Sequence, residues 1–133
     1  MNARSVIRVA ALVVILQTPG TGAVLAQMII PSPAKPTGAE LFKRQCATCH
    51  TTHSSDAQRQ GPTLEGISGR KVGTIPGFKY SPAFAKVDFL WDDDRLNAWL
   101  TNPQAVIAGA IMPYSQANAE TRAAIIGYLK ELH

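Results

Sequence analysis

The stretch Cys46-Ala47-Thr48-Cys49-His50 decides how the rest of this 133-residue chain is interpreted. Two thiols separated by two residues, with an imidazole directly after the second, are the attachment signature of a c-type haem. Each thiol can add across one vinyl group of the porphyrin to form a thioether, and the short spacer lets one turn of backbone reach both vinyls. The next side chain, His50, then lies where a ring nitrogen can ligate the iron. The sequence therefore predicts one haem c, bound covalently through Cys46 and Cys49.

A Cys-x-x-Cys pair has two other common uses, a redox-active disulfide and half of a metal site. A thioredoxin-like site would follow a strand in a βαβ pattern, and the sequence shows neither. A zinc site would need a second pair of Cys or His ligands at metal-binding spacing. Beyond His50 the chain offers His53 and His133, one three residues away and one at the chain end. The pattern favours haem attachment over both alternatives.

The N-terminal segment has the pattern of a secretory signal peptide. Arg4 and Arg8 precede the apolar run 9–16, helix breakers follow, and small residues end at Ala26. That run is too short to cross a bilayer, which needs roughly 20 apolar residues. A cleaved leader is therefore favoured over a retained membrane anchor. We expect residues 1–26 to be removed, which predicts a periplasmic protein with no membrane span after cleavage.

The charge balance excludes a nucleic-acid-binding protein. The formal charge of +4 falls to about +2 without the leader, because 11 of the 13 Lys and Arg then face 9 Asp and Glu. Basic residues do not cluster on one element, as they would in a nucleic-acid-binding stripe. Residues 27–36 contain several prolines and predict a flexible lead-in. Residues 37–133 are expected to form one small domain.

The first predicted helices are marked by their N-terminal signals. Thr37 with Glu40 three residues later forms a capping box, which predicts a helix from about Gly38 to Ala47. Ser81 followed by proline predicts a second, short helix through about Lys86, with Ser81 as its cap. Between these two helices the chain is polar or rich in glycine, and we expect it to be loop.

Two further helices are predicted in the C-terminal half. Acidic residues at 92–94 suit a helix N-terminus, and this helix must end before Pro103. Another loop is expected to follow through Ala117. Asn118 can then cap a last helix over roughly 119–132. Because no strand pattern or internal repeat is evident, the sequence predicts an all-α, loop-rich fold.

A second axial ligand, opposite His50, can be sought among the remaining methionines and histidines. Met28 lies in the expected tail. His53 is only three residues from His50, so the chain keeps it on the same side of the haem as His50. His133 lies at a terminus that tends to fray. Met112 lies in a loop between two predicted helices, from which it can reach the other face. Its alternative role is apolar packing. A His/Met pair would raise the reduction potential and close both faces of the iron.

The chain is similar to the class I cytochromes c, the small soluble type found in mitochondria and bacteria, over about residues 38–132. The resemblance is carried by the following segments: Cys46-x-x-Cys49-His50, Gly61-Pro62-x-Leu64-x-Gly66, Gly69-Arg70-x-x-Gly73, Gly77-Phe78-x-Tyr80-Ser81-x-Ala83, Trp91, Asn102-Pro103 and Met112. It implies the cytochrome c fold, with three main helices and short helices around one covalent haem. The first and last helices would cross, with Gly38 and Phe42 meeting Ile125 and Tyr128.

The resemblance also implies roles for four further residues that bind the cofactor. The carbonyl of Pro62 would accept a hydrogen bond from the proximal His50 ring and fix its orientation. Arg70, Tyr80 and Trp91 would lie near the haem propionates, where buried carboxylates need partners.

The chain differs from the class I pattern at several positions around the expected second ligand. The ligand loop reads Ala108-Gly109-Ala110-Ile111-Met112, where many relatives carry proline, then threonine and lysine before the methionine. Trp99 replaces a tyrosine near the methionine sulfur, and its indole could still donate to that atom. The residues at 45, 104 and 105 are Gln, Gln and Ala where relatives that dock to acidic partners often carry lysine. We therefore expect weaker electrostatic steering than in strongly basic members.

The function predicted from these features is single-electron transfer in the periplasm, without catalysis. The expected partners are redox proteins, namely a donor dehydrogenase or reductase and an acceptor such as a terminal oxidase, and the protein would be a monomer or part of a redox complex. One alternative is a haem c subunit stably docked to a periplasmic dehydrogenase or oxidoreductase; Ile111 and Tyr114 would favour such a drier interface. Another is a peroxidase or gas sensor with an open iron, which would require that Met112 does not ligate.

Overall fold

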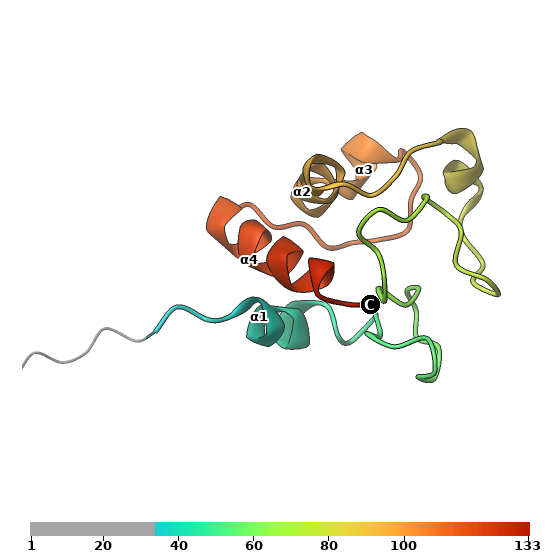
Figure 1. The fold of residues 1–133 in the computed structure, drawn as a ribbon. Helices are drawn as coiled ribbons and strands as arrows, with labels where there is room; N and C mark the ends of the chain where they lie inside the picture. Colours follow the sequence, from blue (N-terminus) through green and yellow to red (C-terminus); the bar gives the residue numbers. More distant parts are fainter. Residues whose placement is uncertain (1–33) are drawn as a thin grey trace, which may run out of the picture. The chain divides into compact units, whose positions relative to one another are not determined.

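The computed structural model describes residues 34–133, so the expected signal peptide (1–26) and most of the expected lead-in (27–36) lie outside the described part. The element order is α1 (Gly38–Gln45), the 3-10 helix η1 (Pro82–Lys86), α2 (Asp93–Thr101), α3 (Pro103–Val106) and α4 (Ala119–Lys130) (Figure 1). The only β-pairing within residues 34–133 is one isolated bridge. The all-α prediction is confirmed. No helix of this part has the length and apolar character needed to cross a membrane.

Helix α1 begins with the predicted capping box. The Thr37 hydroxyl accepts from the Glu40 backbone N–H at 3.3 Å, and the Glu40 carboxylate accepts from the Thr37 N–H at 2.7 Å. The helix ends two residues earlier than predicted, because the N–H groups of Cys46 and Ala47 both bond to one carbonyl, that of Phe42. The chain then makes one more turn, in which the N–H groups of residues 49 and 50 donate to the carbonyl of residue 46.

Helices α1 and α4 cross in contact, as the resemblance implies (Figure 1). A Cβ added at Gly38 would overlap the carbonyl oxygen of Ala124, so only glycine permits this approach of the two backbones. The rings of Phe42 and Tyr128 lie 5.3 Å apart between centroids. Ile125 is fully buried. This crossing supplies one side of the core.

The caps of α2 and α4 explain where these helices begin. An Asp92 carboxylate oxygen accepts from the Arg95 N–H at 2.7 Å, and the Asn118 side chain accepts from the Thr121 N–H at 2.9 Å. Each side chain satisfies a backbone donor that the first turn leaves free. The Asn118 cap is as predicted, whereas α4 ends at Lys130 rather than near residue 132.

The structure corrects two sequence predictions. The segment after α2 is not an uninterrupted loop, because Asn102 accepts from the Gln104 N–H at 3.1 Å and Pro103 occupies the first turn of α3. Ser81 stands at the N-cap position of η1 but makes no side-chain capping bond. Its hydroxyl donates instead to the carbonyl of Gly109 at 3.1 Å. It therefore fixes a distant loop rather than the adjacent helix.

The glycine-rich loop after the Cys46–His50 turn is paired with the segment that leads into α2. The Gly69 N–H donates to the Trp91 carbonyl at 2.7 Å, and the Trp91 N–H donates to the Arg70 carbonyl at 2.9 Å. Gly69 has a φ of +77°, which L side chains rarely adopt. This pairing places Arg70 and Trp91 side by side next to the core.

Candidate functional site

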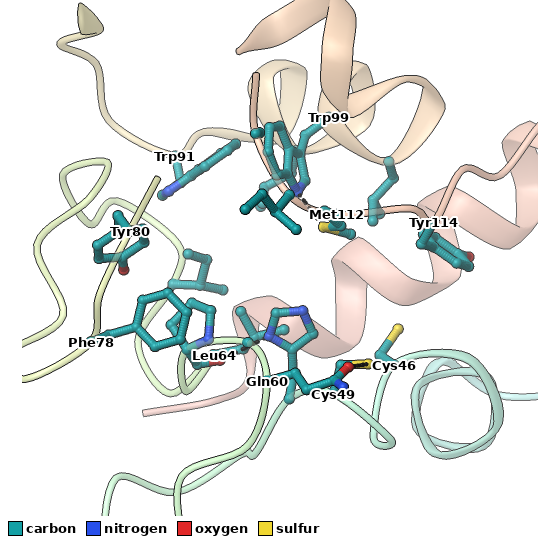
Figure 2. A pocket seen from close by; sticks show the side chains of 18 of the residues that line it. Cys46, Cys49, Gln60, Leu64, Phe78, Tyr80, Trp91, Trp99, Met112 and Tyr114 are labelled. Atoms are coloured by element: carbon teal, nitrogen blue, oxygen red, sulfur yellow. Dashed lines mark hydrogen bonds between the residues drawn. The ribbon is translucent and has the colours of Figure 1, made fainter. Parts of the chain in front are cut away.

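The main cavity of the domain is apolar and has a volume of about 560 Å³, within the range of cofactor sites. Its walls come from the turn 46–50, the glycine-rich loop, α2, the loop before α4, and α4 itself. Figure 2 shows the side chains that converge on it. The apolar walls are formed chiefly by Leu64, Ile67, Leu96, Leu100, Ile125 and Leu129. A cavity of this kind excludes water from a bound apolar group.

The two cysteines lie at the edge of this cavity beside the end of α1 (Figure 2). Both are free thiols. Burial, and secondly the neighbouring Cys49, raises the pKa of the Cys46 thiol to about 11. Cys49 donates a hydrogen bond to the Gln60 side chain at 3.4 Å. A thiol with a raised pKa is a weak nucleophile at neutral pH, so Cys46 does not resemble the low-pKa cysteine of a redox-active disulfide.

His50 is oriented by the loop that follows it. Its Nδ1 donates to the carbonyl oxygen of Pro62 at 2.8 Å, as the resemblance implies. A Cβ at Gly61 would overlap the imidazole ring, so a side chain at this position would displace it. Burial lowers the pKa of His50, although the bond to Pro62 opposes this. The neutral ring with its proton on Nδ1 leaves the Nε2 lone pair free to bind a metal.

Met112 enters the cavity from the side of α2, away from Cys49 (Figure 2). The indole N–H of Trp99 donates to its sulfur at 3.1 Å. The other candidate ligands lie elsewhere or outside the described residues. His53 is 64% exposed and lies 3.8 Å from a carboxylate oxygen of Glu65, His133 is exposed at the chain end, and Met28 precedes residue 34.

Arg70, Tyr80 and Trp91 all contribute to the cavity walls. The Arg70 guanidinium donates to the carbonyls of Glu65 at 2.5 Å and Thr63 at 3.1 Å, and the ion pairs found in residues 34–133 do not include it. Burial lowers the pKa of Arg70 and raises that of Tyr80. A half-buried cation without a carboxylate partner suits a ligand that carries carboxylates.

Aromatic rings complete one wall, and among them Phe84 was not singled out by the sequence analysis. Trp99 lies 5.3 Å from Trp91 and 6.1 Å from Phe84 between ring centroids, in edge-to-face arrangements. The Tyr80 ring lies 4.7 Å from that of Phe78. The apolar character of residues 78 and 84 was visible in the sequence, but their place in this wall depends on the loop path, which no local pattern encodes.

Polar contacts at the cavity edge were also missed. The Tyr114 hydroxyl donates to the Gln45 side chain at 2.6 Å, and the Gln116 amide donates to the same oxygen at 3.1 Å. The Gln104 side chain bonds the backbone of the ligand loop. Residues 45 and 104 were noted only as replacements for lysine. Contacts between residues 69 or 71 positions apart leave no signal in one sequence.

The residues around the cavity fit a porphyrin of the predicted kind. The walls are apolar, and two thiols lie at one edge. An oriented imidazole nitrogen and a thioether sulfur also line the cavity. A half-buried guanidinium provides for carboxylates. Within residues 34–133 no three His, Cys, Asp or Glu side chains are grouped so as to bind a metal ion by themselves.

Comparison with known proteins gives one family. A family model described as Cytochrome c matches residues 36–133. The chain is 39% identical over 95 residues to "Cytochrome c" of Sesamum indicum, which covers 71% of this chain and 86% of the relative. It is 39% identical over 100 residues to "Cytochrome c" of Ulva intestinalis, covering 74% and 88%. It is 39% identical over 103 residues to "Cytochrome c type-1" of Ascaris suum, covering 77% and 91%.

Proposed function

Because the chain belongs to the cytochrome c family, we propose that it is a periplasmic single-electron carrier whose haem iron is ligated by His50 and Met112. The family binds haem c covalently through two cysteines, and Cys46 and Cys49 are the only cysteines of this chain. It is an electron-transfer protein and not an enzyme. When bound, the haem supplies a one-electron couple.

The protein's own residues fix the geometry and the environment of this couple. Pro62 orients His50, and Trp99 donates to Met112, so both ligand atoms are held before any change of oxidation state. Apolar walls exclude water, and the lower local dielectric strengthens the interaction of the haem with each nearby charge and dipole. Pre-set ligands and a dry site reduce the rearrangement that accompanies electron transfer.

The observation that carries this proposal is the sulfur of Met112 in the cavity, hydrogen-bonded to Trp99 at 3.1 Å. We expect the oxidised protein to show a weak sulfur-to-iron charge-transfer band in the far red. Met112→Ala should abolish the band, while Met28→Ala, in the lead-in, should leave it unchanged. Persistence of the band in Met112→Ala would remove Met112 from the iron. Rapid carbon monoxide binding by the reduced parent protein would instead support an open iron.

The periplasmic location rests on the leader, since the eukaryotic relatives in the comparison do not bear on it. We expect the holoprotein in the periplasmic fraction of bacteria to begin at Gln27, with its mass increased by that of one haem. A charge in the apolar run, as in Leu12→Arg, should block export and leave a colourless product with free thiols. A coloured, membrane-bound protein that begins at Met1 would contradict both the cleavage and the location.

A docked subunit is the second candidate function, and one observation favours it. Ile111, directly before Met112 at the cavity edge, is 88% exposed. A large apolar side chain in that place would be buried by a permanent partner. Size-exclusion chromatography of the native, untagged protein distinguishes the two candidates, because a shuttle elutes as a free monomer and a subunit elutes in a larger, coloured complex.

A further inference from the structure

The Gln104 side chain bonds the ligand loop at two consecutive residues. Its carbonyl oxygen accepts from the Gly109 N–H at 3.0 Å, and its amide nitrogen donates to the Ala110 carbonyl at 2.5 Å. The Ser81 hydroxyl donates to the Gly109 carbonyl at 3.1 Å. These three bonds fix the backbone two to three residues before Met112. Of the three, two come from one carboxamide.

Few side chains could make both bonds of Gln104. A carboxamide presents a donor and an acceptor side by side, so it can bond an N–H and a carbonyl of adjacent residues together. Lysine, which related proteins often carry at this position, has donors but no acceptor. Alanine stands at position 108 where many relatives have proline, so this loop also lacks the φ restriction that a proline ring imposes. The loop of this chain therefore needs another constraint.

We propose that Gln104 is a positioning residue for Met112, which keeps the sulfur in place by clamping residues 109 and 110. This rests on the proposed ligation by Met112. The clamp acts through the backbone, since Gln104 bonds Gly109 and Ala110 rather than the sulfur. Without it, the loop gains conformations in which the sulfur lies away from the iron. A competing ligand then meets less resistance, and its apparent affinity rises by the extent to which these conformations are populated.

The test measures binding of imidazole, a ligand that competes with the methionine, to the oxidised holoprotein by spectral titration. Gln104→Glu keeps the acceptor for Gly109 but loses the donor to Ala110. Gln104→Leu keeps the size of the side chain and loses both bonds. We expect imidazole to bind about fivefold more tightly to Gln104→Glu and more than about tenfold more tightly to Gln104→Leu, from the usual free energy of one or two hydrogen bonds. Gln58→Leu, at an exposed position of the loop before Gly61, is the matched control and should bind imidazole like the parent.

The result that overturns the clamp is an imidazole affinity of Gln104→Leu equal to that of the parent. If Gln104 served only overall stability, thermal unfolding of the variant would change while imidazole affinity would not, and the proposal would fail in the same way. Failure of Met112 as the ligand looks different. In that case Met112→Ala binds imidazole no more tightly than the parent, and the far-red band is missing or insensitive to this substitution.

Discussion

The indole N–H of Trp99 donates a hydrogen bond to the sulfur of Met112 at 3.1 Å, from a side chain that is itself 8% exposed. The indole N–H can only donate, so Trp99 is the donor and the Met112 sulfur is the acceptor in both oxidation states of the protein. The bond withdraws electron density from the sulfur. A thioether that donates less to the iron favours the reduced form, because the oxidised form depends more on electron donation.

Replacing this donor should lower the reduction potential. In Trp99→Phe the ring still packs against Trp91 and Phe84, but the bond to Met112 is lost. One hydrogen bond is worth about 0.5–1.5 kcal/mol, so we expect a decrease on the order of 20–60 mV for this one-electron couple. The far-red band should also shift. Both are measured by redox titration with absorption spectroscopy.

The control for this prediction is Trp91→Phe, which removes an indole from the same aromatic wall without touching the sulfur. It should leave the position of the far-red band unchanged. An unchanged potential and band in Trp99→Phe would mean that the indole serves packing alone.

A side chain at position 61 should disturb the proximal ligand. The Cβ of Gly61→Ala would overlap the imidazole ring of His50, so the ring must turn and its bond to Pro62 must weaken. We expect the free energy of unfolding to fall by about 1–3 kcal/mol because of overpacking. We also expect a change in the spin state of the oxidised iron. Chemical denaturation and the absorption spectrum report the two effects.

Gly66→Ala separates steric overlap from backbone strain. Gly66 has a φ of +59° and open space around it, so alanine there should cost about 1–2 kcal/mol through its left-handed conformation alone. Its spectrum should match the parent's. A normal low-spin spectrum in Gly61→Ala would show that the ring of His50 has room to move.

Much of the fold followed from local signals in the sequence. The Thr37–Glu40 capping box, the Asn118 cap and the Cys46–His50 turn were predictable because each depends on residues within four positions. Ser81 was misjudged for the same reason. A serine before proline is a good local cap, but its hydroxyl finds a carbonyl 28 residues away. Local propensity could not weigh that tertiary partner.

The site was predictable where a motif or a resemblance supplied it. His50, Pro62 and Met112 were anticipated, and the structure brings all three to the cavity. The contacts of Gln45 and Gln104 were not, because glutamine carries no local signature and its partners are backbone atoms or distant side chains. The sequence analysis noted only that these positions lack the lysines of related proteins. That comparison says nothing of the hydrogen bonds that the glutamines make instead.

Electron transfer with small charged redox reagents should depend little on ionic strength. Of the two charged residues that line the cavity within the described part, Arg70 is half-buried and is expected to face the haem carboxylates, which leaves Lys79. The edge residue Ile111 is neutral. We expect the rates with an anionic and a cationic reagent to change by less than about twofold between low and high salt, because the local field is weak. Stopped-flow kinetics measure this directly.

A charge placed at position 111, on the cavity edge, should make the electron-transfer rates depend on ionic strength. Ile111→Lys should accelerate the anionic reagent and slow the cationic one at low salt, with both effects lost at high salt. Ala123→Lys adds the same charge on the exposed side of α4 and should change neither rate by much. A steep salt dependence in the parent protein would contradict the weak steering inferred from its sequence and its cavity edge.

Two helical glycines, Gly38 at the α1–α4 crossing and Gly127 on the exposed side of α4, should respond to alanine with opposite signs. A Cβ at Gly38 would overlap the Ala124 carbonyl and lie 2.8 Å from the Tyr128 Cβ, whereas a Cβ at Gly127, within α4, would meet no atom within 4 Å. Gly38→Ala must push the helices apart, so it should lower the free energy of unfolding by about 1–3 kcal/mol. Gly127→Ala adds a better helix former without a clash and should raise it by about 0.5–1 kcal/mol. Urea denaturation of the two holoproteins gives both values, and a Gly38→Ala protein as stable as the parent would show that the close approach of α1 and α4 is not needed.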